Sequence, residues 1–311
     1  MQGARVKGPL DSTKPAVLWR EPEDLAARNI LYGPGGPENA PRGEFRFVKE
    51  IVEGASPKFD VVDEQGVHWR VKPGDEARSE TAATRLLWAV GYFADETYYV
   101  PELRVEGLKK TTLTRGGQYI LEDGVIVGVR MERRSKDHKK TGSWSWFKNP
   151  FVGTRELSGL KIMMALMNNW DLKPLNNSIY EGNGEYRYLV SDVGATFGRT
   201  GEHFTRTKDN LDHYVQSKFI RKTTPEAVDF VVDSRPILLF AMFVPTYVEQ
   251  TKRERVVKNI PREHARWMGQ LLSRLSEQQI RDCFRAGNYS PEEIDGFTKK
   301  IQERIAQLNQ L

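Results

Sequence analysis

The sequence predicts an α+β fold in two parts, a small β-rich part with one helix and a mainly helical part after it. In the first part, apolar and polar residues alternate in short runs, which is typical of half-buried strands. In the second part, apolar residues recur at helical spacing. Between them the composition changes, because a basic run and then an aromatic run follow Met131. The expected divisions are an extended arm over 1–43, the β-rich part over 44–132 and the helical part over 133–311.

The β-rich part contains short alternating runs that are bounded by turn residues. One helix is predicted over 75–89, because Ala82, Leu86 and Ala89 share a face and Gly91 follows as a C-terminal cap. The predicted strands are 45–51, 59–63, 67–71, 98–105, 118–121 and 125–131.

The helical part begins with a helix that Thr154 caps and that ends near Asn168. Two short strands flank the turn Gly182-Asn183-Gly184. We expect everything beyond about residue 205 to be helical. The clearest signal there is Ser290-Pro291-Glu292-Glu293, an N-cap with proline at the first helical position and a capping-box glutamate.

The composition is that of an ordinary globular protein, with 39% hydrophobic and 29% charged residues. Lys and Arg number 47 against 42 acidic residues, and this mild excess does not by itself indicate nucleic acid. The single cysteine, Cys283, excludes an internal disulfide and a cysteine-based metal site. Its helical spacing from Ile280 and Phe284 predicts a buried thiol.

No apolar run approaches the ~20 residues of a membrane span. Residues 1–14 lack the apolar core of a signal peptide. We therefore expect a soluble protein, either cytoplasmic or secreted after a signal peptide has been removed. The histidines show no zinc-binding spacing, and no G-x-S-x-G sequence supports a serine hydrolase.

A compact polar cluster follows the helix that ends near Asn168. Asp171 is followed by Lys173 two residues later and by Asn176 five residues later, and an apolar strand over 186–190 then leads to Asp192. This set suits phosphoryl transfer, in which one carboxylate orients the attacking hydroxyl, a lysine neutralises charge, and an amide and a second carboxylate hold Mg²⁺. The alternative is an ordinary polar loop after a helix. We favour the functional interpretation because all of these residue types occur together, between a helix and a strand.

A lysine at the end of a strand, Lys72, is followed by a helix that carries Glu80. Such a lysine can grip the α- and β-phosphates of a nucleotide while the glutamate holds it in place. Glu76 competes for the glutamate role, but Glu80 lies within the helix body rather than at its first turn. Taken alone, the pair is better explained as a surface lysine and a solvated helix face.

The turn over 53–58 separates two predicted strands and contains Gly54, Ser56 and Lys58. Small residues let backbone N–H groups approach phosphate oxygens, and Lys58 adds charge. The turn contains one glycine instead of G-x-G-x-x-G, so an ordinary hairpin loop is the alternative.

The stretch 130–151 is basic and then aromatic, a combination that can bind single-stranded nucleic acid or another polyanion. The alternative is a solvated basic loop whose aromatic residues pack inside the protein. We favour this alternative because Glu132 and Asp137 dilute the charge, so nucleic acid is not an expected partner. The residues concerned are Arg130, Arg133, Arg134, Lys136, Lys139, Lys140, Trp144, Trp146, Phe147 and Phe151.

Together these residues resemble the protein-kinase-like superfamily. Asp171-Leu-Lys-Pro-Leu-Asn176 resembles the kinase catalytic loop, and Asp192-Val-Gly194 resembles the Asp-Phe-Gly metal motif. Val71-Lys72 is similar to the end of the nucleotide-binding strand, with Glu80 as its helix partner. The segment 127–131 is similar to the strand that enters the adenine-binding hinge.

The resemblance implies a two-lobed kinase-like fold with ATP between the lobes. It implies that Asp171 acts as base, that Lys173 lies at the γ-phosphate and that Asn176 and Asp192 hold Mg²⁺ or Mn²⁺. Met131 would lie at the nucleotide in the hinge.

Several departures from typical protein kinases place the resemblance among divergent members, such as HipA-type and secretory-pathway kinases. Asn169-Trp170 stands where His-Arg is usual, no Ala-Pro-Glu follows the metal motif, and only eight residues separate Lys72 from Glu80. The predicted function is an ATP- and Mg²⁺-dependent phosphotransferase that acts on a hydroxyl of a protein or small molecule. The alternatives are an inactive kinase-like nucleotide-binding module, AMP transfer, or a polyanion-binding protein that uses 130–151.

Overall fold

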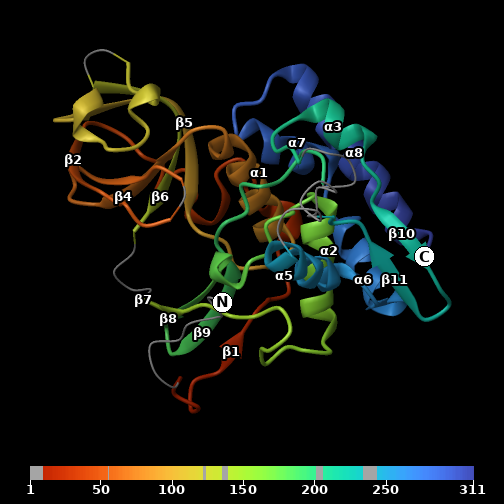
Figure 1. Ribbon diagram of the computed structural model, residues 1–311. Helices are drawn as coiled ribbons and strands as arrows, with labels where there is room; N and C mark the ends of the chain where they lie inside the picture. The colour runs from red at the N-terminus through yellow and green to blue at the C-terminus, as the bar shows by residue number, and fades with distance from the viewer. Residues whose placement is uncertain (1–9, 55, 122–123, 135–138, 201–205, 234–243) are drawn as a thin grey trace.

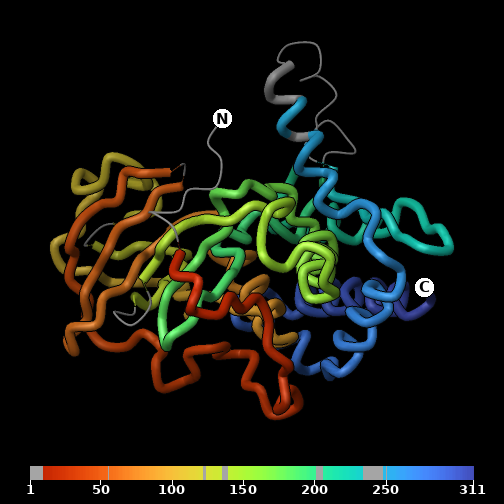
Figure 2. Tube along the Cα trace, turned by 90° about the horizontal axis from the view of Figure 1, so that it is seen from below, coloured from red at the N-terminus to blue at the C-terminus, as the bar shows by residue number. Residues whose placement is uncertain are grey.

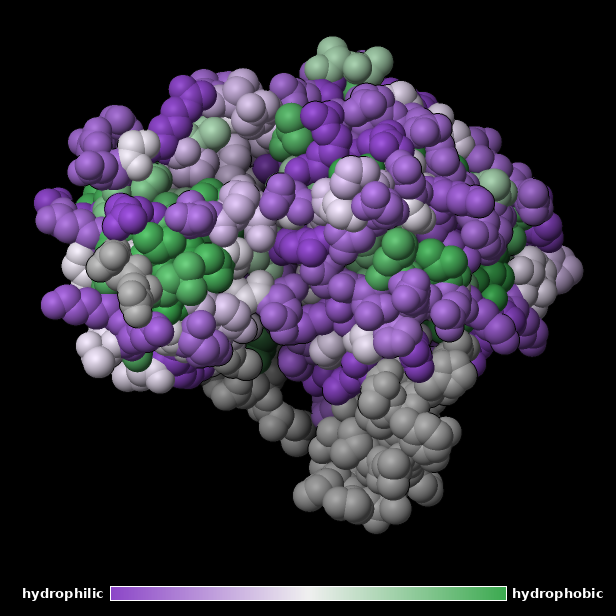
Figure 3. Space-filling model, turned by 90° about the horizontal axis from the view of Figure 1, so that it is seen from above, coloured by the Kyte–Doolittle hydropathy of each residue, from purple (hydrophilic) through white to green (hydrophobic). Residues whose placement is uncertain are grey.

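The computed structural model describes residues 10–54, 56–121, 124–134, 139–200, 206–233 and 244–311. These residues form an α+β fold. A β-structure lies at one end, most of the helices lie at the other, and α1 (Glu76–Ala89) lies between them (Figure 1). No helix in the described ranges is long and apolar enough to cross a membrane. On the face shown in Figure 3 the surface is mostly hydrophilic, with separate hydrophobic areas over the barrel side and over the helical side.

Five strands close into a barrel in the order β2-β3-β4-β6-β5. Its interior is filled by a hydrophobic cluster that includes Phe59, Val61, Val71 and Met131, which are fully buried. Because side chains alternate along a strand, the neighbouring Lys72 points to the outside of the barrel. The strands are β2 (Phe45–Glu50), β3 (Phe59–Asp63), β4 (His68–Pro73), β5 (Thr97–Glu106) and β6 (Val125–Arg133).

Five of the predicted strands of the β-rich part are present, but the one predicted over 118–121 is not. Its place is taken by a short 3-10 helix, Gly117–Tyr119, in which the N–H groups of Tyr119 and Ile120 bond to carbonyls three residues earlier. Two consecutive glycines, Gly116 and Gly117, favour a turn over a strand at this place.

Helix α1 packs across the outside of the barrel and also against the C-terminal helices. Its apolar residues Ala82, Leu86 and Leu87 belong to the second and larger hydrophobic core. Leu18 and Ile30, from the N-terminal segment, are buried in the same core. The helix that carries Glu80 is therefore fixed from two sides.

A second sheet has the strand order β1-β9-β8-β7. The N-terminal strand β1 pairs in parallel with β9, and β8 and β9 form the hairpin that the Gly182-Asn183-Gly184 turn predicts. Asn183 and Gly184 both have positive φ, as a tight hairpin turn requires. The strands are β1 (Ala16–Val17), β7 (Lys139–Gly142), β8 (Asn177–Gly182) and β9 (Glu185–Val190).

The remaining helices surround a core of stacked and edge-on aromatic rings that includes Phe197, Phe284 and Phe297. Thr154 caps α2 and Ser290 caps α8 with a capping box, as predicted. The helices are α2 (Arg155–Leu166), α3 (Leu211–Gln216), α5 (Val244–Glu254), α6 (Arg262–Leu272), α7 (Glu277–Arg285) and α8 (Pro291–Asn309). Figure 2 shows α5 projecting from the rest of this part.

The expectation that everything beyond residue 205 is helical is wrong. A small sheet is formed by β10 (Ile220–Thr223), β11 (Ala227–Phe230) and β12 (Ile260–Pro261). In β11 the buried Val228 and Phe230 alternate with partly exposed residues, which is a strand period. Pro225 also breaks any helix through this segment.

Candidate active site

The first part of the site joins strand β4 to helix α1. The Lys72 ammonium lies 3.0 Å from Glu80 Oε2 and 2.8 Å from Glu76 Oε2. Gly74, between the strand and the helix, has a φ of +106°, which a residue with a side chain rarely adopts. The chain therefore turns directly from strand into helix, and this explains how residues only eight apart meet.

Two cations share the Glu80 carboxylate. Arg130 Nε, from the neighbouring strand β6, lies 3.2 Å from Glu80 Oε2, and Arg130 is the direct cross-strand neighbour of Lys72. Burial raises the pKa of Glu80 above its ordinary value, and Arg130 and Lys72 oppose this rise. Because both cations touch the same oxygen, we expect Glu80 to be ionised at neutral pH. Arg130 belongs to the basic and aromatic stretch 130–151, but its position in this site was not predicted from the sequence.

The Lys72 ammonium is held in its charged form by the carboxylates around it. Burial lowers the pKa of Lys72, but Glu80, Asp192 and Glu76 together raise it above its ordinary value. Glu76 is partly buried, which raises its pKa, but Lys72 and Lys208 outweigh this effect and bring the Glu76 pKa to about 2. Lys208 Nζ lies 3.1 Å from Glu76 Oε1. The group is thus a network of opposite charges around one buried lysine.

The second part of the site is the polar loop after α2. Lys173 Nζ lies 2.8 Å from Asp171 Oδ2. Asn176 donates through Nδ2 to the Asp171 carbonyl oxygen at 2.7 Å and to its Oδ2 at 3.2 Å. The short 3-10 helix Pro174–Asn176 folds the loop back on itself and brings the three side chains together.

A third contact to Asp171 comes from far along the chain. Arg253 Nη1, on α5, lies 3.5 Å from Asp171 Oδ1, so each carboxylate oxygen has a cation beside it. Sequence reasoning missed Arg253, because nothing local links it to a residue 82 positions away.

The base of the same loop is fixed by Arg304, which is fully buried on α8. Its Nη1 donates to the Leu166 carbonyl oxygen at 2.7 Å and to Asn168 Oδ1 at 2.9 Å. Arg304 thus binds carbonyl groups at the C-terminal end of α2, where the helix dipole favours a cation. One feature of the sequence indicates a buried arginine here, because Arg304 lies beside Ile301 and Ile305 on the apolar side of the helix.

Asp192 joins the two parts of the site. It follows strand β9, and the N–H groups of Ser191 and Asp192 donate to the Asn176 carbonyl oxygen at 2.8 and 3.3 Å. Asp192 Oδ1 lies 3.4 Å from Lys72 Nζ, and its side chain is 48% exposed. The residues predicted from the loop, the strand and the helix therefore form one continuous group.

The turn over 53–58 lies beside this group. Arg115 holds the turn, donating to the carbonyl oxygens of Gly54 at 2.7 Å and of Val52 at 2.8 Å. Ser56 Oγ lies 3.4 Å from Glu76 Oε2. Burial lowers the pKa of Lys58, and the nearby cations Arg70 and Lys72 lower it further. Ala55 lies outside the described residues, as do Lys136 and Asp137 of the basic run.

The structure does not bring the Met131 side chain to this group. Met131 is fully buried inside the barrel, because it faces the interior while its neighbour Arg130 faces Lys72. Only the Met131 backbone, as part of β6, borders the site.

Asn176 and Asp192 could hold a divalent metal together with a phosphate ligand. In the described part of the chain, no group of three or more His, Cys, Asp or Glu side chains could hold a metal ion. Asn176 uses Nδ2 toward Asp171, so its Oδ1 would be the atom available to a metal. Mg²⁺ usually takes one or two carboxylates and completes its shell with water and substrate phosphates. The donor set thus fits a metal that arrives with a nucleotide.

The basic and aromatic stretch is partly buried in its described residues. Trp144 and Trp146 are only 2% exposed and pack in the larger core, as the alternative interpretation predicts. Arg130 is buried against Glu80, and Arg134 pairs with Glu132. Phe147 is 53% exposed, and Lys139 and Lys140 are also exposed.

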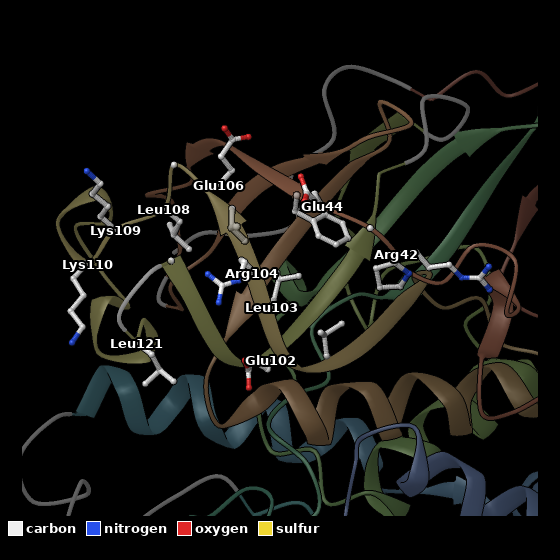
Figure 4. Close-up of a pocket in the computed structure, with 17 residues that line it drawn as sticks. Arg42, Glu44, Glu102, Leu103, Arg104, Glu106, Leu108, Lys109, Lys110 and Leu121 are labelled. Atoms are coloured by element: carbon white, nitrogen blue, oxygen red, sulfur yellow. The ribbon is translucent and has the colours of Figure 1, made fainter.

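A hollow of about 1170 Å³ lies elsewhere, along the seam where β2 and β5 close the barrel (Figure 4). Apolar residues such as Leu103 and Leu121 line it together with charged residues of both signs, including Arg42, Glu102 and Lys110. None of the candidate site residues lines it.

Comparison with known proteins finds similarity to solved structures alone. No family model matches the chain, and no curated protein matches it. A crystal structure of the Helicobacter pylori proinflammatory kinase CtkA matches with a TM-score of 0.45 and 11% identity, over 81% of this chain and 93% of that one. Structures of the Golgi casein kinase match with TM-scores of 0.36 and, with Mn and ADP bound, 0.35. Both have 12% identity, over 85% and 86% of this chain and 75% of the other.

These three structures are of kinases. TM-scores below 0.5 mark a likeness too loose to carry a functional conclusion. The functional conclusion therefore rests on the side chains of the site.

Proposed function

We propose that this protein is a kinase-like phosphotransferase that uses ATP with Mg²⁺ or Mn²⁺ and acts on a hydroxyl acceptor. The observation that carries the proposal is one unbroken series of contacts. Asp171 contacts Asn176, the Asn176 backbone binds that of Asp192, and Asp192 contacts Lys72, which pairs with Glu80. These are the residue types that phosphoryl transfer requires, and their contacts join them in one series.

In this proposal the two hydrophobic cores belong to two lobes with the nucleotide between them. The lobes would span residues 44–132 and 133–311, with residues 1–43 as an N-terminal arm. The contacts of α1 with the larger core would fix the two lobes relative to each other. The charged outer face of β4 and β6, which carries Lys72 and Arg130, would cover the nucleotide site from the barrel side.

Lys72 would bind the α- and β-phosphates, with Glu80 holding its ammonium in place. The backbone of the turn over 53–58 and Lys58 would lie over the phosphates from the barrel side. Asn176 Oδ1 and the Asp192 carboxylate would hold the metal. When bound, the metal neutralises charge on the phosphates.

The transfer step would take place at Asp171. Its carboxylate would accept the proton of the acceptor hydroxyl as the hydroxyl oxygen forms a bond to the γ-phosphorus. The bond between that phosphorus and the β–γ bridging oxygen breaks, and ADP leaves. Lys173 would offset the negative charge of the moving phosphoryl group.

A second candidate function is a kinase-like module that binds nucleotide without transferring phosphate. The observation that favours it is the pair of cations at Asp171, Lys173 at 2.8 Å and Arg253 at 3.5 Å. Each cation lies at a carboxylate oxygen that an acceptor hydroxyl would need to approach. One of them must move, or be shared with the phosphate, for Asp171 to accept a proton.

The proposal is tested by thermal unfolding with ATP, with and without Mg²⁺ or Mn²⁺, followed by incubation with labelled ATP. Ligand at 100 times its Kd stabilises a protein by about 2.7 kcal/mol, which is easily measured. Label from the γ-position of ATP should appear in an acceptor or in the protein itself. Label from the α-position would instead show AMP transfer, and stabilisation without any transfer would favour the binding module.

A further inference from the structure

A groove of about 820 Å³ opens next to Asp171. Three segments that are far apart in the sequence form its walls: the loop that contains Trp146 and Phe147, the polar loop from Leu172 to Leu175, and helix α5 with its C-terminal extension to Val256. Arg253 both lines this groove and contacts the Asp171 carboxylate at 3.5 Å. The groove therefore leads to the proposed catalytic base.

Exposed apolar side chains converge in this groove. Phe147, Leu175 and Val248 are 53%, 42% and 46% exposed, and they come from the three different walls. Eight large hydrophobic residues are exposed in the part of the chain that the structure describes, and three of them lie here. Single exposed apolar residues are ordinary, whereas a cluster that lines a groove marks a binding surface.

The charges in the groove are mainly positive. Lys173, Lys252, Arg253 and Arg255 line it, against the single carboxylate of Glu249. Lys173 pairs with Asp171 at 2.8 Å and Lys252 pairs with Glu249 at 3.1 Å, but the two lysine side chains are 44% and 55% exposed, so an anionic group that enters the groove can reach them. A surface of this kind attracts anionic groups and disfavours cationic ones.

We propose that this groove binds a polypeptide acceptor in which an apolar side chain lies close to acidic residues, and that it presents a hydroxyl of this polypeptide to Asp171. The inference rests on the proposed phosphotransferase function and names its substrate class. Clefts of ~300–1,000 Å³ hold ligands of several side chains in size. A small hydroxyl compound at Asp171 would leave most of the groove, and all three exposed apolar residues, without a contact.

The test uses the full chain with ATP and two peptides that each contain one serine. In the first peptide the serine is flanked by leucine and glutamate residues, and in the second the glutamates are replaced by lysines. The variants are Val248→Glu and Lys252→Glu, which change the groove outside the proposed catalytic residues. Matched controls are Val215→Glu and Lys218→Glu, at exposed positions that do not line the groove. Stabilisation by ATP is measured for every variant as a check on the nucleotide site and the fold.

The inference predicts that the acidic peptide is phosphorylated and the basic peptide is not. Each groove variant should lose about tenfold or more in kcat/KM for the acidic peptide, while both controls and the ATP stabilisation stay unchanged. Equal use of the two peptides, equal effects of groove and control variants, or transfer to small polyols with no transfer to peptide would each overturn it. Absence of both ATP stabilisation and transfer would instead refute the proposed function, so the two failures are distinguishable.

Discussion

The Lys72 ammonium and the Glu80 carboxylate are in contact at 3.0 Å. Glu80 lies on a helix that is fixed by the larger core and by the ion pair of Arg78 with Glu293 on α8, at 2.6 Å. The Lys72 and Glu80 side chains are 8% and 1% exposed, so this is a buried pair and not the alternative of a surface lysine beside a solvated helix face.

Removing the Glu80 charge should destabilise the fold more than removing the Lys72 charge. Glu80→Gln removes the carboxylate that Lys72 and Arg130 share. Lys72 keeps Glu76 and Arg130 keeps Glu132, so the loss should be at most about 3–5 kcal/mol, which is the cost of breaking a buried pair. In Lys72→Met, Glu80 keeps Arg130, so we expect a smaller loss of stability together with loss of ATP stabilisation. The free energy of unfolding is measured by urea denaturation.

Glu76→Gln serves as the control for this comparison, because Glu76 also contacts Lys72 but its side chain is 20% exposed. It should cost less stability than Glu80→Gln. An equal loss in the two glutamine variants would show that Glu80 has no special part in the network.

Asp171→Asn should bind ATP but lose nearly all phosphoryl transfer. A general base contributes roughly 10²–10⁴-fold to the rate, and its removal affects kcat far more than nucleotide affinity. The measurement is label transfer from γ-labelled ATP, with ATP stabilisation measured in parallel. Asp212→Asn, at an exposed position on α3, is the control and should transfer at the rate of the unchanged protein. Survival of transfer in Asp171→Asn would remove Asp171 from the role of base.

Asp192→Ala should abolish the part of the ATP stabilisation that depends on Mg²⁺ or Mn²⁺. Asp192 supplies the carboxylate of the proposed metal site, and its side chain is 48% exposed, so the fold should tolerate the change. The measurement is the difference in thermal unfolding between ATP with metal and ATP with a chelator. Asp295→Ala removes a carboxylate that is 66% exposed on α8 and is the control. An unchanged metal effect in Asp192→Ala would place the metal elsewhere.

Spacing along the chain predicts the part of the site that lies within one loop, and the family resemblance adds the distant Lys72 and Asp192. The long-range contacts of Arg253 and Arg304 could not be predicted. Asp171, Lys173 and Asn176 are within one short loop, where spacing alone brings their side chains together. The contacts of Arg253 and Arg304 with this loop cross 82 and 136 residues and depend on how the helices pack. No local pattern in a single sequence records such packing.

The fold, like the site, has elements that local sequence signals predict and long-range contacts that they do not. The strands of the barrel have a clear period of two, and the caps at Thr154 and Ser290 are local signals, so the sequence predicts these elements well. The hairpin of β10 and β11 was missed because its short alternating run lies among helices. The barrel closure between β2 and β5 rests on two parallel residue pairs, Phe45 with Val105 and Arg46 with Glu106. The pattern of apolar and polar residues does not predict that β2 and β5 pair in this register.

Two neighbouring carboxylates, the partly buried Asp95 and the buried Glu132, should make the stability of the protein depend on pH near neutrality. Burial raises the pKa of Asp95 to about 8, and the neighbouring Glu132 adds to the rise, whereas Arg130 and Lys140 oppose it. The pKa of Glu132 moves the other way, because Arg130 and Arg134 outweigh the effect of its burial and lower it. At neutral pH one carboxyl of the pair, Asp95, therefore keeps a proton in the folded state.

The sign of the effect follows from linkage. Between the ordinary pKa of an aspartate, about 3.9, and the folded-state pKa near 8, the folded protein binds a proton that the unfolded chain does not. The contribution of Asp95 to stability is thus fully present below about pH 4 and is lost as the pH rises through 8, with a slope of at most about 1.4 kcal/mol per pH unit. Asp95→Asn keeps a neutral side chain at every pH. The variant should therefore gain stability relative to the unchanged protein as the pH rises from 6 to 9, which urea denaturation across this range measures. Asp295→Asn, at a carboxylate that is 66% exposed on α8, should show no such trend. Parallel pH profiles for Asp95→Asn and the unchanged protein would show that Asp95 is already ionised in the fold.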